Sequence, residues 1–118
     1  RMTTFRDQEQ VVLGIAGRAS SRVKVFEYGK SNQGRPLRVL AISNPKNIQR
    51  LEEIRAQNRK LAMGEAVETE KMPAIVWINQ CIHGNEPASF ESAMVLIYNL
   101  AASRNPRITK MLDQAVVM

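Results

Sequence analysis

The 118-residue sequence predicts an α/β fold, in which a mixed β-sheet has helices on both faces. Three patterns lead to this prediction. Two segments rich in β-branched and aromatic residues, 23–28 and 37–43, are joined by a short loop with two glycines, which is typical of an antiparallel hairpin. Residues 74–79 are almost continuously apolar, as expected of a strand buried on both faces. Elsewhere, apolar residues recur at the spacing of amphipathic helices.

Start and stop signals support four helices. Thr4, followed three residues later by Asp7, predicts a capping box at the first of them. Asparagine–proline pairs at 44–45 and 105–106 place a capping side chain before a proline, which is favoured at the first helical position. Gly64 is expected to end the second helix as the residue after its C-cap. The helices are therefore predicted over residues 5–19, 45–63, 87–103 and 106–113.

Positive charge is concentrated around the hairpin. The chain has 17 Lys and Arg residues against 11 Asp and Glu, a net charge of +6, and residues 18–38 hold six basic residues and one acidic residue. A basic stripe is expected of nucleic-acid-binding proteins, but these usually interleave aromatic side chains, and here only Phe26 and Tyr28 do so, on the strand face of Lys24. We therefore interpret the stripe as a solvated surface and do not expect nucleic acid as a partner.

The last residues bear on domain organisation. Residues 115–118, Ala-Val-Val-Met, have the pattern of a strand. A buried strand in that position would leave an unpaired apolar edge, which proteins normally avoid, so we expect residues 1–118 to be the N-terminal portion of one larger domain. No apolar run approaches the roughly 20 residues that span a membrane, and no secretory signal segment is visible. The single cysteine, Cys81, excludes a disulfide within the chain.

One short motif, His83-Gly-Asn-Glu-Pro87, carries the chemistry. It follows the apolar strand and opens a helix, and the carboxyl ends of strands are where open α/β sheets place their sites. Gly84 is free to take a positive φ and turn His83 and Glu86 toward one point, while Pro87 restrains Glu86. An imidazole nitrogen and a carboxylate oxygen are zinc ligands, but a catalytic zinc has three protein ligands. From spacing alone, a surface loop with a locally bonded histidine remains an alternative.

Cys81 precedes the histidine by two residues. On a strand, Cys81 and His83 would share a face, and a thiol nucleophile with a histidine base is conceivable. A small buried thiol behind the site is the favoured interpretation.

Three stretches of the chain resemble a known family. Residues 28–37, Tyr-Gly-Lys-Ser-Asn-Gln-Gly-Arg-Pro-Leu, are similar to its G-x-S-x-x-G-R-P-L turn, and residues 37–44 to the strand that follows. Residues 75–91 are similar to its strand, H-G-N-E-P metal loop and helix. The family is that of the zinc carboxypeptidases, peptidase M14, to which carboxypeptidase A belongs. The stretch 44–54 makes the chain most similar to large, exported bacterial members.

The resemblance implies that residues 1–118 are an N-terminal fragment of one zinc carboxypeptidase-like catalytic domain. By position, His83 resembles the first zinc ligand and Glu86 the second. The family's third ligand, its catalytic glutamate and the arginines that hold the substrate would lie beyond Met118. The resemblance therefore implies one zinc ion, no catalytic residue within this chain, and no substrate-binding residue that can be assigned here.

The implied activity is hydrolysis of the C-terminal peptide bond of a peptide or protein by metal-activated water. The 118-residue piece is expected to be inactive alone and to need the remainder of the catalytic domain as its partner. Export to the periplasm or the outside of the cell is expected from the resemblance alone.

Three alternatives remain open. Zinc deacylases similar to aspartoacylase and succinylglutamate desuccinylase also use H-G-N-E, although the G-R-P-L turn and Pro87 favour the peptidase. A non-catalytic relative would have kept the fold and lost the metal, which the presence of both His83 and Glu86 disfavours. A basic nucleic-acid-binding module is the third alternative.

Overall fold

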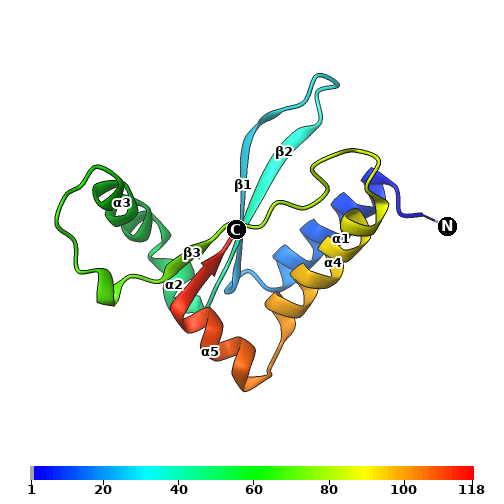
Figure 1. Cartoon of the computed structure of the whole chain (residues 1–118). Coiled ribbons are helices and arrows are strands. Elements are labelled where there is room, and N and C mark those ends of the chain that lie inside the picture. The colour runs from blue at the N-terminus through cyan, green and yellow to red at the C-terminus, as the bar shows by residue number, and fades with distance from the viewer. Residues whose placement is uncertain (1) are drawn as a thin grey trace.

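A computed structural model describes residues 2–118 and contains one four-stranded sheet (Figure 1). Its strands lie in the order β1-β2-β4-β3. The β1–β2 and β2–β4 pairs are antiparallel and the β3–β4 pair is parallel, so the predicted mixed sheet and hairpin are confirmed. The strands are β1 (Val23–Lys30), β2 (Pro36–Ile42), β3 (Ala74–Val76) and β4 (Ala115–Val117).

Helices cover both faces of the sheet, as predicted. In Figure 1, α1 and α4 lie side by side on one side of the sheet, and α2 and α3 lie on the other. Within residues 2–118, no helix is long and apolar enough to cross a membrane. The helices are α1 (Phe5–Arg18), α2 (Pro45–Gln49), α3 (Leu51–Ala62), α4 (Pro87–Ala102) and α5 (Pro106–Gln114), with a single 3-10 turn over Thr69–Lys71.

The two faces of the sheet bury two separate apolar clusters. Because neighbouring strand residues point to opposite faces, Ile42 packs with α1, α4 and α5, whereas Ala41 packs with α3. Val117 and Val116 of β4 divide between the two clusters in the same way. The central strands β2 and β4 therefore contribute to both apolar clusters and connect the two helical layers.

The predicted helix starts are confirmed. Thr4 and Asp7 form the capping box, each accepting from the backbone N–H of the other. The Asn44 side chain accepts from Asn47 N at 2.7 Å, and the Asn105 side chain accepts from the first turn of α5. Local side-chain chemistry therefore sets these three starts.

The helix predicted over residues 45–63 is two helices. Arg50, with φ −110°, ends α2 and precedes α3. Its guanidinium Nη2 donates to the carbonyl oxygen of Lys71 at 3.1 Å, so the interruption coincides with a contact to a distant loop. Gly64 takes φ +77°, as its predicted place after the helix requires.

The prediction that residues 74–79 form a strand buried on both faces is wrong. β3 ends at Val76 and lies at the edge of the sheet, where Trp77 is 58% exposed. The expected unpaired edge at residues 115–118 is also wrong, because β4 is buried between β2 and β3. The apolar pattern does not reveal strand order, and order decides which strand is the edge.

A buried polar network fixes the start of β4. Ser43 is fully buried, and its Oγ lies 2.9 Å and 2.7 Å from the carbonyl oxygens of Leu112 and Ala115. Asn47 Nδ2 donates to Ser43 Oγ at 3.0 Å. Buried polar groups are costly unless paired, so this network specifies how the end of α5 meets β2 and α2.

An acidic side chain ties the segment before α1 to α4. Glu91 accepts from the backbone N–H and the hydroxyl of Thr3, both at 2.7 Å. These bonds, the backbone one first, hold the pKa of the Glu91 carboxyl below its ordinary 4.5. A group with a lowered folded-state pKa adds stability above its unfolded pKa and loses it as pH falls through the folded value.

We therefore expect Glu91→Gln to lower the melting temperature at pH 7. The difference in melting temperature between wild type and variant should shrink below pH 4.5, the ordinary pKa of a glutamate. Thermal unfolding from pH 7 down to pH 3 measures this. Glu65→Gln, which changes an exposed carboxylate on the loop before β3, is the control. An equal difference at every pH would contradict the assignment.

Candidate metal centre

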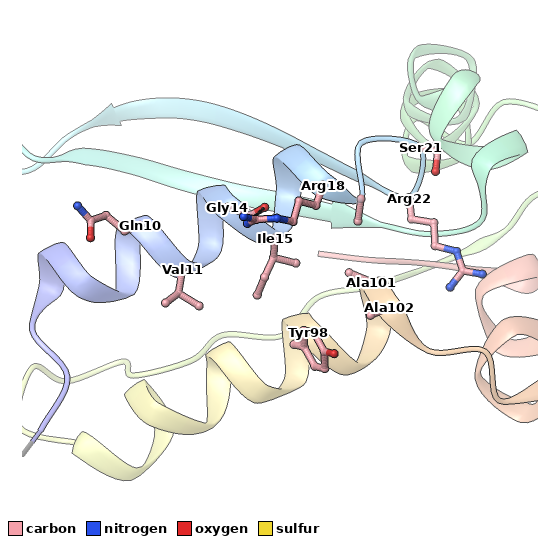
Figure 2. Close-up of a pocket in the computed structure, with 11 residues that line it drawn as sticks. Gln10, Val11, Gly14, Ile15, Arg18, Ser21, Arg22, Tyr98, Ala101 and Ala102 are labelled. Carbon is pink, nitrogen blue, oxygen red and sulfur yellow. Dashed lines mark hydrogen bonds between the residues drawn. The ribbon is translucent and has the colours of Figure 1, made fainter.

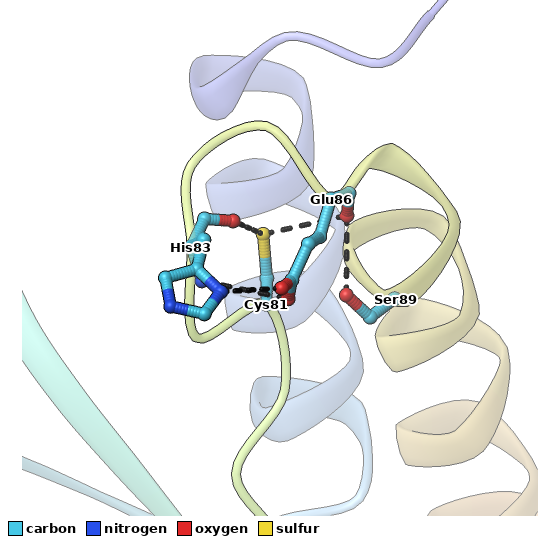
Figure 3. Close-up of polar contacts among 4 residues, drawn as sticks. All are labelled: Cys81, His83, Glu86 and Ser89. Carbon is cyan, nitrogen blue, oxygen red and sulfur yellow. Dashed lines mark hydrogen bonds and ion pairs between the residues drawn. The ribbon is translucent and has the colours of Figure 1, made fainter.

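The segment between β3 and α4, residues 77–86, carries the motif and is called the metal loop below. It brings His83 and Glu86 together: His83 Nδ1 lies 2.6 Å from Glu86 Oε1, and the His83 backbone N–H lies 3.4 Å from Oε2 (Figure 3). Their side chains are 73% and 42% exposed. The predicted pair is therefore adjacent and open to solvent, although it lies on a loop and not directly at the end of a buried strand.

The chain reaches this geometry through a tight turn. Glu86 N donates to the His83 carbonyl at 3.2 Å, and Glu86 is the N-cap of α4 with Pro87 at the first helical position. Gly84 does not take the positive φ that was expected of it; Cys81 does, with φ +53°. The positive φ therefore lies at Cys81, two residues before the turn that runs from His83 to Glu86.

Cys81 contacts the loop backbone. Its Sγ lies 3.2 Å from the carbonyl oxygen of His83 and 3.5 Å from that of Glu86, and the residue is half-buried. The His83 imidazole meets the Glu86 carboxylate instead. Cys81 and His83 lie on a loop and not on one strand face, so the less favoured interpretation as a nucleophile and its base lacks the arrangement that it assumed.

The donor set fits zinc. Two ligand atoms of a tetrahedral zinc, with bonds of about 2.0–2.2 Å, lie about 3.4 Å apart, so the present hydrogen bond needs to open by less than about 1 Å. Exposed side chains can make such an adjustment. Within the described residues, no three His, Cys, Asp or Glu side chains are grouped to hold a metal. The pair supplies two donors, and its role as ligands stays a prediction.

A groove of about 1050 Å³ borders the metal loop. Gly84 and Asn85 line one wall, and the hairpin contributes Leu37 to the other. Arg35 also lines it, with its guanidinium 4.8 Å from the ring centre of Phe5. The groove therefore adjoins the metal loop, although His83 and Glu86 themselves do not line it.

The basic stripe is partly engaged within the protein. Arg38 pairs with Glu9 of α1 and with Glu27 of β1, and the Glu9 bond is the main cause that raises the pKa of the guanidinium. A register shift between Glu27 and Gly29 places Tyr28 with Arg38 along the groove, while Phe26 packs toward α3. The expectation that Lys24, Phe26 and Tyr28 share one face is therefore wrong.

A second hollow of about 600 Å³ lies between α1 and α4 (Figure 2). Ile15, Arg18 and Tyr98 lie along it, and Gln10 and Arg22 lie toward its two ends. Neither His83 nor Glu86 lines it. This hollow is therefore separate from the candidate metal centre.

Ser89 also contacts the metal loop, and the sequence alone does not predict this contact. Its Oγ donates to the Glu86 carbonyl at 3.1 Å, whereas Ser92, one turn later, donates to Ser89 itself. Both serines sit on one apolar-periodic helix, so only the structure distinguishes them.

Comparison with known proteins identifies a family for the chain. A family model described as zinc carboxypeptidase, peptidase M14, matches residues 9–118, and no curated protein matches the chain. The match covers nearly all of the sequence, including the hairpin, the metal loop and α4. The chain therefore belongs to the zinc carboxypeptidase family.

Proposed function

We propose that this chain supplies one side of the zinc site of a metallocarboxypeptidase that hydrolyses C-terminal peptide bonds of peptides or proteins. One observation carries the proposal: in a member of the zinc carboxypeptidase family, His83 Nδ1 and Glu86 Oε1 meet at 2.6 Å on an exposed loop. His83 and Glu86 are the proposed ligands, and one zinc ion is the proposed cofactor.

A bound zinc would lower the pKa of a water molecule and polarise the scissile carbonyl. The chain's own part is to hold the ion. A histidine that binds a metal through Nδ1 does so as a neutral ring with its proton on Nε2, so His83 would present a free Nδ1 lone pair to the ion. Glu86 contributes a negative charge that partly neutralises the cation.

The site is proposed to be completed from outside residues 1–118. His83 is the only histidine in the sequence, and the part of the chain described here groups no third ligand with the pair. We therefore propose that residues 1–118 are the N-terminal portion of the catalytic domain and are inactive alone. The exposed apolar edge at β3 supports a larger domain, because further chain would cover it. Export remains a prediction.

The full-length gene product tests the proposal. We expect one zinc per molecule by elemental analysis and hydrolysis of N-blocked dipeptides, which 1,10-phenanthroline abolishes and added zinc restores. The 118-residue chain alone should release no amino acid from the same dipeptides. Hydrolysis of N-acyl amino acids but not of dipeptides would identify a deacylase, and a zinc-free, inactive protein would overturn the proposal.

A further inference from the structure

We infer that Cys81 and Ser89 are positioning residues of the metal loop, because their Sγ and Oγ converge on the backbone of the two proposed ligands. The inference rests on the proposed function, since it concerns how His83 and Glu86 are held for a zinc ion. Neither Cys81 nor Ser89 is proposed to touch the metal or the substrate.

The contacts converge on two carbonyl oxygens (Figure 3). The Glu86 carbonyl lies 3.1 Å from Ser89 Oγ and 3.5 Å from Cys81 Sγ, and it also accepts from Phe90 N at 3.3 Å. The His83 carbonyl lies 3.2 Å from Cys81 Sγ and accepts from Glu86 N at the same distance. The thiol thus bridges the backbones of both proposed ligands, and Ser89 fixes the second of them from the helix.

The Glu86 side chain does not cap α4, so other groups must hold the Glu86 backbone. Helix N-caps usually turn their side chains back onto the first turn, but Glu86 makes no side-chain cap bond in α4. Its carboxylate faces His83 instead. The backbone of Glu86 must therefore be held by other groups, and Cys81 and Ser89, both half-buried, are placed to do so.

The backbone conformation of Cys81 is a second, independent observation that supports a positioning role. A non-glycine residue at φ +53° lies in the left-handed region, which is sterically unfavourable for L-residues. This conformation carries Sγ to the two carbonyl oxygens. A strained backbone conformation persists where surrounding contacts hold it, and here the contacts of Cys81 are with the carbonyl groups of the two proposed ligands.

Zinc affinity of the full-length gene product, measured by chelator competition, tests the inference. Groups that orient metal ligands typically contribute about 10- to 100-fold to metal affinity, so we expect losses of that size for Cys81→Ala and Ser89→Ala. Cys81→Ser and Ser89→Thr keep a donor and should stay within about threefold of wild type. Cys81→Gly relieves the backbone strain without a thiol and should be as weak as Cys81→Ala. Ser92→Ala is the matched control.

Amide hydrogen exchange of the metal-free protein gives a readout that needs no zinc. The amides of residues 82–86 and of Ala88 should exchange faster in Cys81→Ala and Ser89→Ala at an unchanged melting temperature. Wild-type affinity in Cys81→Gly, an equal loss in Ser92→Ala, or faster exchange with unaltered affinity would each overturn the inference and leave the proposed function intact. A wild-type protein that binds no zinc would overturn both.

Discussion

Glu86→Gln should weaken zinc binding by more than about 100-fold and abolish peptidase activity, because it replaces an anionic ligand by a neutral amide of the same size. Groups that only orient metal ligands change the metal affinity by about 10- to 100-fold, so the loss of a ligand itself should change the affinity by more. His83→Ala should have an effect of the same size. Zinc stoichiometry and chelator competition on the full-length gene product measure both variants, and far-UV circular dichroism checks that they fold.

The matched control for this experiment is Glu65→Gln, which makes the same chemical change on an exposed loop. It should bind zinc as tightly as wild type. If Glu86→Gln also keeps wild-type affinity, the contact between His83 and Glu86 is a local surface hydrogen bond and the proposed site is wrong.

Leu112→Ala is expected to lower the free energy of unfolding by about 2–5 kcal/mol, the usual effect of truncating a buried leucine. Leu112 is 1% exposed and is the only fully buried residue of α5. It packs in the cluster that contains Ile42 and Val117, so the cavity would lie under the centre of the sheet. Such a loss is a large part of the total stability of a small domain. Urea denaturation measures it.

The neighbouring residue provides the control. Met111 lies on the same helix and is 41% exposed, so Met111→Ala should change stability by less than about 1 kcal/mol. Equal losses for Leu112→Ala and Met111→Ala would show that helix propensity matters more here than packing.

Features that depend on neighbouring residues are predictable from the sequence. The capping box at Thr4, the asparagine–proline starts of α2 and α5, and the hairpin all follow from side chains within a few positions. Their energetics are local, so the sequence contains the relevant partners.

Features that depend on distant partners are not predictable in this way. Arg50 interrupts a continuous helical pattern where it contacts the Lys71 carbonyl, which lies 21 positions away. The apolar run at β3 predicts burial, but strand order places it at the edge. An apolar pattern reports how much surface a segment can bury and does not report which segment covers it.

The metal loop has some features that the sequence predicts and others that it does not. The motif predicts that His83 and Glu86 approach each other, and the structure brings them to 2.6 Å. The sequence predicts a positive φ at Gly84, because glycine adopts it most easily, yet Cys81 adopts it. Contacts of one thiol with two carbonyl groups are not encoded in residue spacing, so the role of Cys81 and Ser89 emerges only in three dimensions.

The place of β4 between β2 and β3 affects how the chain folds as it is synthesised. β3 emerges well before β4, and β4 is its neighbour in the sheet, so a nascent chain that stops short of residue 115 can form the hairpin but cannot dock β3. Such long-range pairing is slow, and we expect Ile75 and Trp77 to be available to chaperones during this interval. The start of the metal loop, where Ile78 N donates to the Met118 carbonyl at 2.7 Å, is therefore fixed only once β4 is in place.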